Sequence, residues 1–358
     1  MSEISNPFWK CIYCGFNESI WSNYYWKCPR CGKPLVINYS KVYEPKGRGI
    51  FRYSKTLPFT PEKTRGEGST PLVVEKQGFN TLLFKLEYLN PTGSFKDRGS
   101  ALAIYYGYRM NYKRVVEDTS GNTGISVTLY SKLYGLKPVI YMPRTAPLGK
   151  KRLISKLGGE IVETIDRSEA SIKVLENTFQ SYYVAHTWNY LYVIGASTIA
   201  YEVFDEYGVP DYVIVPVGSG GLILGLISGF EYLFETGLAD RMPRFIAVQG
   251  YSVQPVFSSI KGYSIEGEDS DLADGIMVPN PPRLIEIVDY LKKYGEEVVL
   301  ICNNEIARAV NELHDMGFIV EPTSASAWAG YLKIRDRLKG SVLIPLTGSG
   351  LKTIAHEP

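Results

Sequence analysis

The sequence predicts an α/β protein with two doubly wound domains whose sheets are largely parallel. Short runs rich in β-branched residues recur along the chain, and amphipathic stretches of helical length separate most of them. This alternation is typical of parallel sheets covered by helices. The number of predicted strands, roughly eight or more, is larger than the number in an average sheet, so we expect two sheets. The predicted strands are 82–87, 114–117, 137–141, 160–163, 182–185, 212–215, 244–248, 298–301 and 341–344.

Length, composition and charge restrict the class of protein. The chain has 358 residues, of which 45% are hydrophobic and 21% charged, as expected for a folded protein of more than one domain. The net charge is only +2, and Lys and Arg are scattered, so neither favours a nucleic-acid partner. We find no apolar run of membrane-spanning length and no signal peptide. We therefore expect a cytoplasmic protein with no nucleic-acid or membrane partner.

Four of the five cysteines form two pairs with the spacing of a metal site. Cys11 and Cys14 make one pair, Cys28 and Cys31 the other, and a glycine follows each pair. Four thiolates on two short turns predict a closed, structural zinc site, in a ribbon covering residues 1–44. A redox-active pair and a ribbon that has lost its metal remain as alternatives. Because such ribbons also occur in nucleic-acid-binding proteins, a non-catalytic binding protein is a rival function.

The domain boundaries follow from changes in composition. Residues 42–71 are irregular and rich in Pro and Gly, which predicts an arm lying on the main body. We place the large domain at residues 45–104 and 196–358. The smaller α/β domain takes residues 105–195, so the chain returns to the first sheet afterwards.

Lys96 is the first candidate for chemistry. It follows a glycine-containing turn and precedes a stretch rich in Ala and Tyr, so it lies near a predicted helix start. The positive end of the helix dipole there favours the neutral, nucleophilic amine, and Phe95 can exclude water. A surface lysine in a loop is the alternative. His186, His314, His356 and Cys302 show no nucleophile–base spacing, and we expect them to be structural.

Two glycine-containing loops each connect a predicted strand to a predicted helix. Amides at a helix N-terminus bind anions, and glycine permits close approach. The first loop fits a carboxylate, although an ordinary capped turn is an alternative. The second fits a phosphate; a dinucleotide fold is disfavoured because the next strand ends near Gln249 rather than at an acidic residue. The loops are Ser120-Gly121-Asn122-Thr123 and Gly218-Ser219-Gly220-Gly221.

Residues 91–98, Pro-Thr-Gly-Ser-Phe-Lys-Asp-Arg, closely resemble the lysine motif of the pyridoxal-phosphate (PLP) enzymes of the tryptophan-synthase-β type, fold type II. Segments 49–53 and 66–72, and the loop from Thr347 to Lys352, are more similar to threonine synthases. This resemblance extends from the cysteine pairs to Lys352. It implies a PLP enzyme with the cofactor in the cleft between two domains, in a homodimer.

The resemblance also implies roles for individual residues. Lys96 holds PLP as a Schiff base, and Asn122 contacts the phenolic oxygen of the cofactor. Thr347 faces the pyridine nitrogen and leaves it largely neutral, which favours elimination and replacement chemistry. The cofactor phosphate is bound by Gly218, Ser219, Gly220 and Gly221, and the substrate carboxylate by Ser120, Gly121 and Thr123.

The implied reaction is a γ-elimination followed by a β-replacement, which converts O-phosphohomoserine and water into L-threonine and phosphate. Lys96 then carries protons between substrate carbons. Tyr192 departs from the pattern, because threonine synthases place there an Arg that holds the substrate phosphate, and losing a bidentate cation is not conservative. A threonine or serine deaminase or a cysteine synthase is therefore the runner-up among PLP enzymes acting on amino acids.

Overall fold

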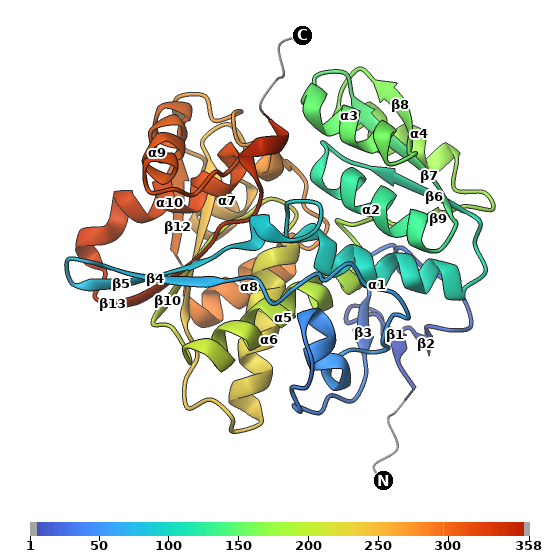
Figure 1. The fold of residues 1–358 in the computed structure, drawn as a ribbon, viewed down its shortest axis with the longest axis horizontal. Coiled ribbons are helices and arrows are strands. Elements are labelled where there is room, and N and C mark those ends of the chain that lie inside the picture. Colours follow the sequence, from blue (N-terminus) through green and yellow to red (C-terminus); the bar gives the residue numbers. More distant parts are fainter. Residues whose placement is uncertain (1–5, 296, 354–358) are drawn as a thin grey trace. The chain divides into compact units, whose positions relative to one another are not determined.

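The computed structural model describes residues 6–295 and 297–353, and within them the chain forms two compact units (Figure 1). The first unit comprises residues 6–69 and 96–195, and the second comprises 70–95 and 196–353. Residues 45–69 and 96–104, which the sequence analysis assigned to the large domain, are grouped with the first unit. The proposed three-part division stays a prediction, and its ends at 1–5 and 354–358 lie outside the described residues.

The first unit is built on a four-stranded sheet in the order β8-β7-β6-β9, with every pair parallel. Strands β6 and β7 are buried along most of their length, which explains their runs of β-branched residues. Because the strands are parallel, their carboxyl ends share one edge. The elements are α1 (Lys96–Arg109), β6 (Arg114–Asp118), α2 (Asn122–Leu133), β7 (Lys137–Pro143), α3 (Leu148–Lys156), β8 (Glu160–Thr164), α4 (Arg167–Glu176) and β9 (Tyr182–Tyr183).

The cysteine-rich segment forms a small antiparallel sheet in the same unit, in the order β2-β1-β3. Its apolar side chains share one core with α1 and with residues near β9. The rings of Trp9 and Tyr106 meet edge to face at 6.0 Å, and the Tyr106 hydroxyl donates to the Ile20 carbonyl at 2.5 Å. The ribbon is thus packed as part of this core. Its strands are β1 (Phe8–Lys10), β2 (Asn17–Ser19) and β3 (Val36–Asn38).

The second unit contains a six-stranded sheet in the order β12-β11-β10-β13-β5-β4. Neighbouring strands are parallel except β4, which forms an antiparallel hairpin with β5 at one edge. Helix α10 packs on the sheet and buries Trp328 against Phe84, with ring centroids 5.7 Å apart. The strands are β4 (Leu72–Gln77), β5 (Asn80–Lys85), β10 (Tyr212–Pro216), β11 (Arg244–Gly250), β12 (Glu297–Ile301) and β13 (Gly340–Pro345).

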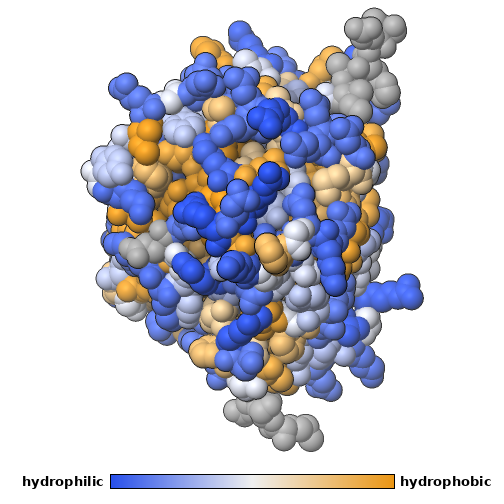
Figure 2. Space-filling view, turned by 90° about the vertical axis from the view of Figure 1, so that its left-hand side faces the viewer, coloured by the Kyte–Doolittle hydropathy of each residue, from blue (hydrophilic) through white to orange (hydrophobic). Residues whose placement is uncertain are grey.

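The helices of the second unit follow its strands. Helix α5 begins in the first unit, and its residues from Ala196 onward are grouped with the second unit. None of the described helices is both long and apolar enough to cross a membrane. The face drawn in Figure 2 is mainly hydrophilic, with hydrophobic areas between the polar side chains. The helices are α5 (Tyr190–Glu206), α6 (Gly221–Glu235), α7 (Pro255–Lys261), α8 (Leu284–Tyr294), α9 (Asn303–Asp315) and α10 (Pro322–Ile334).

The predicted α/β architecture with largely parallel sheets is confirmed, and the strands belong to two major sheets. Each predicted run contains a strand, but two runs end earlier than expected. Strand β5 stops at Lys85, and a short 3-10 helix starts at Glu87. Strand β9 has only two residues, and two positions later Ala185 adopts a φ of 50°, which is incompatible with a continuing strand.

Candidate active site

Lys96 is the first residue of α1, as predicted, and its side chain is half-buried. Close contacts fix the turn that follows it. A Cβ on Gly99 would lie 2.4 Å from Cδ1 of Tyr192, and a Cβ on Gly195 would lie 2.5 Å from the Arg98 carbonyl carbon. Asp97, fully buried, accepts a hydrogen bond from the Ser126 hydroxyl at 2.5 Å. Helices α1, α2 and α5 therefore hold the backbone of Lys96 in place.

Gly99→Ala tests this packing. The added methyl group would overlap the Tyr192 ring, so we expect the free energy of unfolding to fall by about 1–3 kcal/mol. Chemical denaturation measures this change. A variant as stable as the unmodified protein would show that α1 does not need this close contact.

The loop with Ser120, Gly121, Asn122 and Thr123 lies at the carboxyl end of β6. Gly121 has a φ of 149°, and its amide donates to the Thr119 hydroxyl at 3.0 Å. Helix α2 begins at Asn122, and no side chain caps it. The first amides of a helix have no partner within the helix. This end of the sheet therefore offers donors to a ligand.

Lys150, in α3, packs against this loop; the spacing of residues in the sequence did not select it over other cations. Only 1% of Lys150 is exposed, and a Cβ on Gly121 would lie 2.3 Å from Lys150 Cδ. Gly121 thus accommodates both the backbone conformation and the lysine stem. This contact has no signal in the local sequence, because α3 is remote from the loop along the chain.

The second loop, with Gly218, Ser219, Gly220 and Gly221, lies in the second unit between β10 and α6. A Cβ on Gly218 would lie 2.5 Å from the Gly275 carbonyl oxygen, so this residue is packed against the protein. Gly220 has a φ of 91°, and no side chain caps α6. A Cβ on Gly221 would meet nothing within 4 Å. The start of α6 therefore combines unpaired amides with open space.

Thr347, in the second unit, follows β13. Its carbonyl accepts from the Phe95 amide at 3.1 Å, but its hydroxyl has no hydrogen-bond partner among the described residues. The residue is only 3% exposed. A buried hydroxyl without a partner is costly, and in native proteins such a group commonly faces a ligand or an ion.

The four predicted metal ligands come together in the ribbon. The sulfurs of Cys11, Cys14, Cys28 and Cys31 all lie within 4.8 Å of one another. The Cys11–Cys31 and Cys14–Cys28 sulfur distances are both 3.5 Å, too long for disulfides. Burial disfavours the Cys28 thiolate, but hydrogen bonds from the Cys31 and Arg30 backbone amides outweigh it and lower the Cys28 pKa to about 7.

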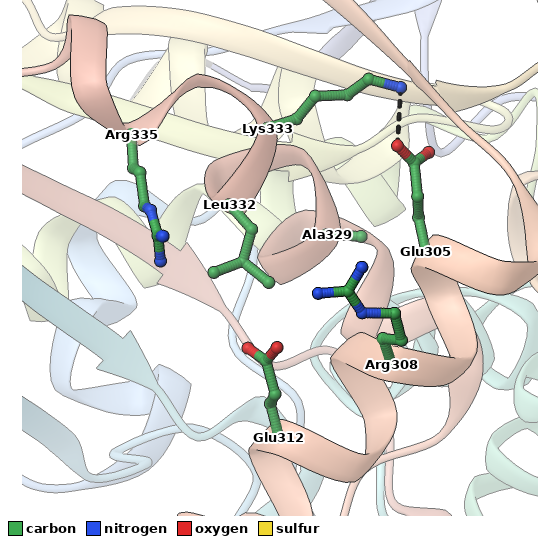
Figure 3. A pocket seen from close by; sticks show the side chains of 7 residues that line it. All are labelled: Glu305, Arg308, Glu312, Ala329, Leu332, Lys333 and Arg335. Carbon is green, nitrogen blue, oxygen red and sulfur yellow. Dashed lines mark ion pairs between the residues drawn. The ribbon is translucent and has the colours of Figure 1, made fainter.

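A charged cavity is lined by none of the predicted site residues (Figure 3). It has a volume of about 250 Å³ and lies between α9 and α10 in the second unit. Lys333 pairs with Glu305 across it at 2.8 Å, and Glu312 accepts from the Trp328 indole at 3.1 Å. These charges satisfy one another in part, and we assign this cavity no role. Its lining residues are Glu305, Arg308, Glu312, Ala329, Leu332, Lys333 and Arg335.

Comparison with known proteins identifies the family. The family model described as "Pyridoxal-phosphate dependent enzyme" matches residues 63–348, which include the lysine and both glycine-containing loops. The chain belongs to this family. The prediction of a PLP enzyme is thereby confirmed.

Curated relatives of this PLP enzyme are threonine synthases. That of Methanocaldococcus jannaschii is 30% identical over 96% of this chain and 92% of the relative. That of Synechocystis sp. is 31% identical over 85% of this chain and 83% of the relative. The predicted likeness to threonine synthases is confirmed by these matches.

Solved structures confirm the fold of the PLP enzyme. The O-acetylserine-dependent cystathionine β-synthase of Helicobacter pylori has a TM-score of 0.69 and 24% identity, with coverage of 81% of this chain and 95% of that one. Serine racemase of Dictyostelium discoideum has a TM-score of 0.63 and 25% identity, with coverage of 78% and 92%.

Proposed function

We propose that this enzyme is a threonine synthase, which converts O-phosphohomoserine and water into L-threonine and phosphate with PLP as cofactor. The observation that carries the proposal is the match to a threonine synthase over 96% of this chain. Solved structures with a similar fold are named for other reactions on amino acids, so the fold alone does not select the substrate.

The residues present fit the cofactor. Gly218, Ser219, Gly220 and Gly221 are assigned to its phosphate, which is supported by the uncapped start of α6 and the open space at Gly221. Thr347 is assigned to the ring nitrogen, supported by its buried hydroxyl without a partner. Lys96 is assigned to the aldehyde carbon and Asn122 to the phenolic oxygen.

When bound, PLP supplies an electron sink for charge that develops on substrate carbons. The chain supplies the proton transfers and the orientation. Lys96, at the start of α1, supplies an amine that can take a proton from one carbon and return it to another. Ser120, Gly121 and Thr123 are assigned to the substrate carboxylate, next to the uncapped start of α2.

A side-by-side turnover assay tests the proposed reaction. The substrates are O-phosphohomoserine, L-threonine, L-serine and O-acetylserine, and the products followed are phosphate, oxo-acid and amino acid. We expect the highest kcat/KM with O-phosphohomoserine. A far higher kcat/KM for deamination of threonine or serine, or for cysteine synthesis, would favour the runner-up functions instead.

The alternative function, a PLP enzyme that acts on a substrate without phosphate, is suggested by Tyr192. Its side chain is only 4% exposed, and its hydroxyl lies 2.9 Å from the Ser100 hydroxyl, so it is packed against α1. A guanidinium there would be buried in the core of the first unit, which is costly without a partner. We therefore expect Tyr192→Arg to destabilise the enzyme and not to improve turnover of O-phosphohomoserine. Increased turnover at unchanged stability would support a substrate without phosphate.

Gly221→Ala tests the phosphate assignment. The new methyl group meets no protein atom within 4 Å, so we expect the stability of the cofactor-free protein to change by less than about 0.5 kcal/mol. The methyl would occupy the space assigned to the phosphate, so PLP affinity should fall at least about tenfold, the loss of roughly one hydrogen bond to a charged group. Ser228→Ala, farther along α6, is the control. Unchanged PLP affinity would contradict the assignment.

The ribbon is proposed to bind structural Zn²⁺ through Cys11, Cys14, Cys28 and Cys31. Tetrahedral sulfurs at about 2.3 Å from zinc lie within about 4 Å of one another, close to the separations in the ribbon. Metal analysis of gently purified protein tests this, with one zinc per chain expected. We also propose that the enzyme is a cytoplasmic homodimer. Light scattering on the purified protein measures the molar mass and so tests the dimer.

A further inference from the structure

Glu117 and His186 form a buried pair that none of the roles above uses. Glu117 lies in β6 and is fully buried, and 5% of the His186 side chain is accessible. Nδ1 of His186 contacts Oε1 of Glu117, and the His186 backbone amide donates to Oε2 at 3.4 Å. The carboxyl group therefore fixes both the ring and the backbone of His186.

The pair lies beside the carboxylate loop. Strands β6 and β9 are parallel neighbours, with Val116 opposite Tyr183, so His186 follows β9 at the edge where the loop from Thr119 follows β6. The imidazole also meets the Tyr192 ring edge-on, with centroids 6.0 Å apart. Tyr192 in turn contacts Ser100, one turn of α1 beyond Lys96. His186 is thus adjacent to both parts of the first unit that are assigned to chemistry.

The second ring nitrogen of His186 remains available. Among residues 6–295 and 297–353, no group accepts from or donates to Nε2. A nearly buried imidazole with one nitrogen anchored and the other unpaired resembles the arrangement by which proteins orient a histidine toward a ligand.

Burial favours the neutral form of both members of the pair. Burial raises the pKa of Glu117 well above its ordinary value; the charge of Asp118 adds to this effect, whereas the His186 backbone amide and the charges of Lys96 and Arg167 partly oppose it. Burial lowers the pKa of His186 well below its ordinary value, and Lys96 and Arg167 add to it. Asp118 is itself held by the Tyr183 hydroxyl at 2.6 Å. With the Glu117 carboxyl group donating to Nδ1, the imidazole carries its own proton on Nε2.

We propose that His186 is a substrate-binding residue, whose Nε2–H donates a hydrogen bond to an anionic oxygen of the substrate, and that Glu117 is the positioning residue for its ring. This inference rests on the proposed function, because it takes the substrate to be an amino acid bound at this site. The oxygen belongs to either the carboxylate or the phosphoryl group, and both accept such a bond.

Two matched substitutions isolate the Nε2 contact. In His186→Asn the amide can keep the contact with Glu117 but has no group at the Nε2 position. In His186→Gln the amide nitrogen reaches about as far as Nε2. Affinities are measured on the PLP-loaded protein from ligand-induced changes in cofactor absorbance, with L-threonine and O-phosphohomoserine as probes, and kcat and KM are recorded separately.

We expect His186→Asn to weaken binding at least about tenfold and His186→Gln to restore part of the loss, as for a hydrogen bond to a charged group. A loss with both ligands assigns the contact to the carboxylate, and a loss with O-phosphohomoserine alone assigns it to the phosphoryl group. Unchanged affinity for both ligands in His186→Asn, with PLP bound, overturns the inference.

A second variant covers the case in which His186→Asn fails to fold. Glu117→Gln keeps the shape of the side chain and an N–H donor toward Nδ1. The affinity for both ligands should therefore stay within about threefold of that of the unmodified enzyme, a smaller change than the loss of one hydrogen bond would cause. Glu117→Ala releases the ring, and a tenfold or greater loss is expected. Equal affinities of these two variants would contradict the positioning role. Failure of the unmodified enzyme to turn over O-phosphohomoserine would instead count against the proposed function, since L-threonine binding is read out independently.

Discussion

Lys96→Ala is expected to abolish both turnover and the visible absorption band of protein-bound PLP. The variant removes the amine assigned to cofactor attachment and to all proton transfers, so activity should fall more than about a thousandfold. Absorbance spectra and phosphate release from O-phosphohomoserine measure the two effects.

Lys137→Ala is the matched control, because Lys137 is an exposed lysine at the start of β7 in the same unit. It should leave the spectrum and the rate unchanged. Residual activity of Lys96→Ala above about one part in a thousand would mean that another group performs the proton transfers.

Removal of the proposed Zn²⁺ from the ribbon is expected to disturb more than the ribbon itself. The ribbon side chains Trp9, Ile20 and Cys28 share a core with α1, so their release should also loosen the helix that begins at Lys96. Structural zinc contributes about 10–16 kcal/mol of binding free energy in zinc-finger peptides, and we expect the free energy of unfolding to fall by more than about 2 kcal/mol.

Hydrogen exchange after chelation, or in Cys28→Ser, locates this effect. Faster exchange is expected at residues 8–38 and at α1, whereas Cys302→Ser, outside the ribbon, should change neither region. Faster exchange in the ribbon alone would show that α1 keeps its packing without the metal.

Local patterns predicted a large part of this structure. Strands such as 114–117 and 212–215 could be predicted from the sequence because buried parallel strands are rich in consecutive β-branched residues. The helix start at Lys96, the two glycine-containing loops and the cysteine pairs could also be predicted, because each is specified by residues close together in the chain. The extra strand residues predicted at 184 and 185 were wrong because nothing in the composition indicates the positive φ of Ala185.

The contacts around the candidate site could not be predicted in the same way. The pairing of Glu117 with His186 and the contact of Lys150 with Gly121 depend on how β6, β9 and α3 pack in three dimensions. His186 was expected to be structural because its partner is remote in the chain. The only local signal was an acidic residue, Glu117, within an apolar strand, where a buried carboxyl group needs a partner.

The close contact between Gly99 and Tyr192 restricts how these two positions can change during evolution. A Cβ at position 99 would overlap the Tyr192 ring and would also lie 2.8 Å from the Tyr192 Cα, so a smaller residue at position 192 does not by itself create the space. Gly99→Ala should therefore remain destabilising even in a Tyr192→Ala background. Among descendants of this sequence, glycine should persist at position 99 whatever residue occupies position 192.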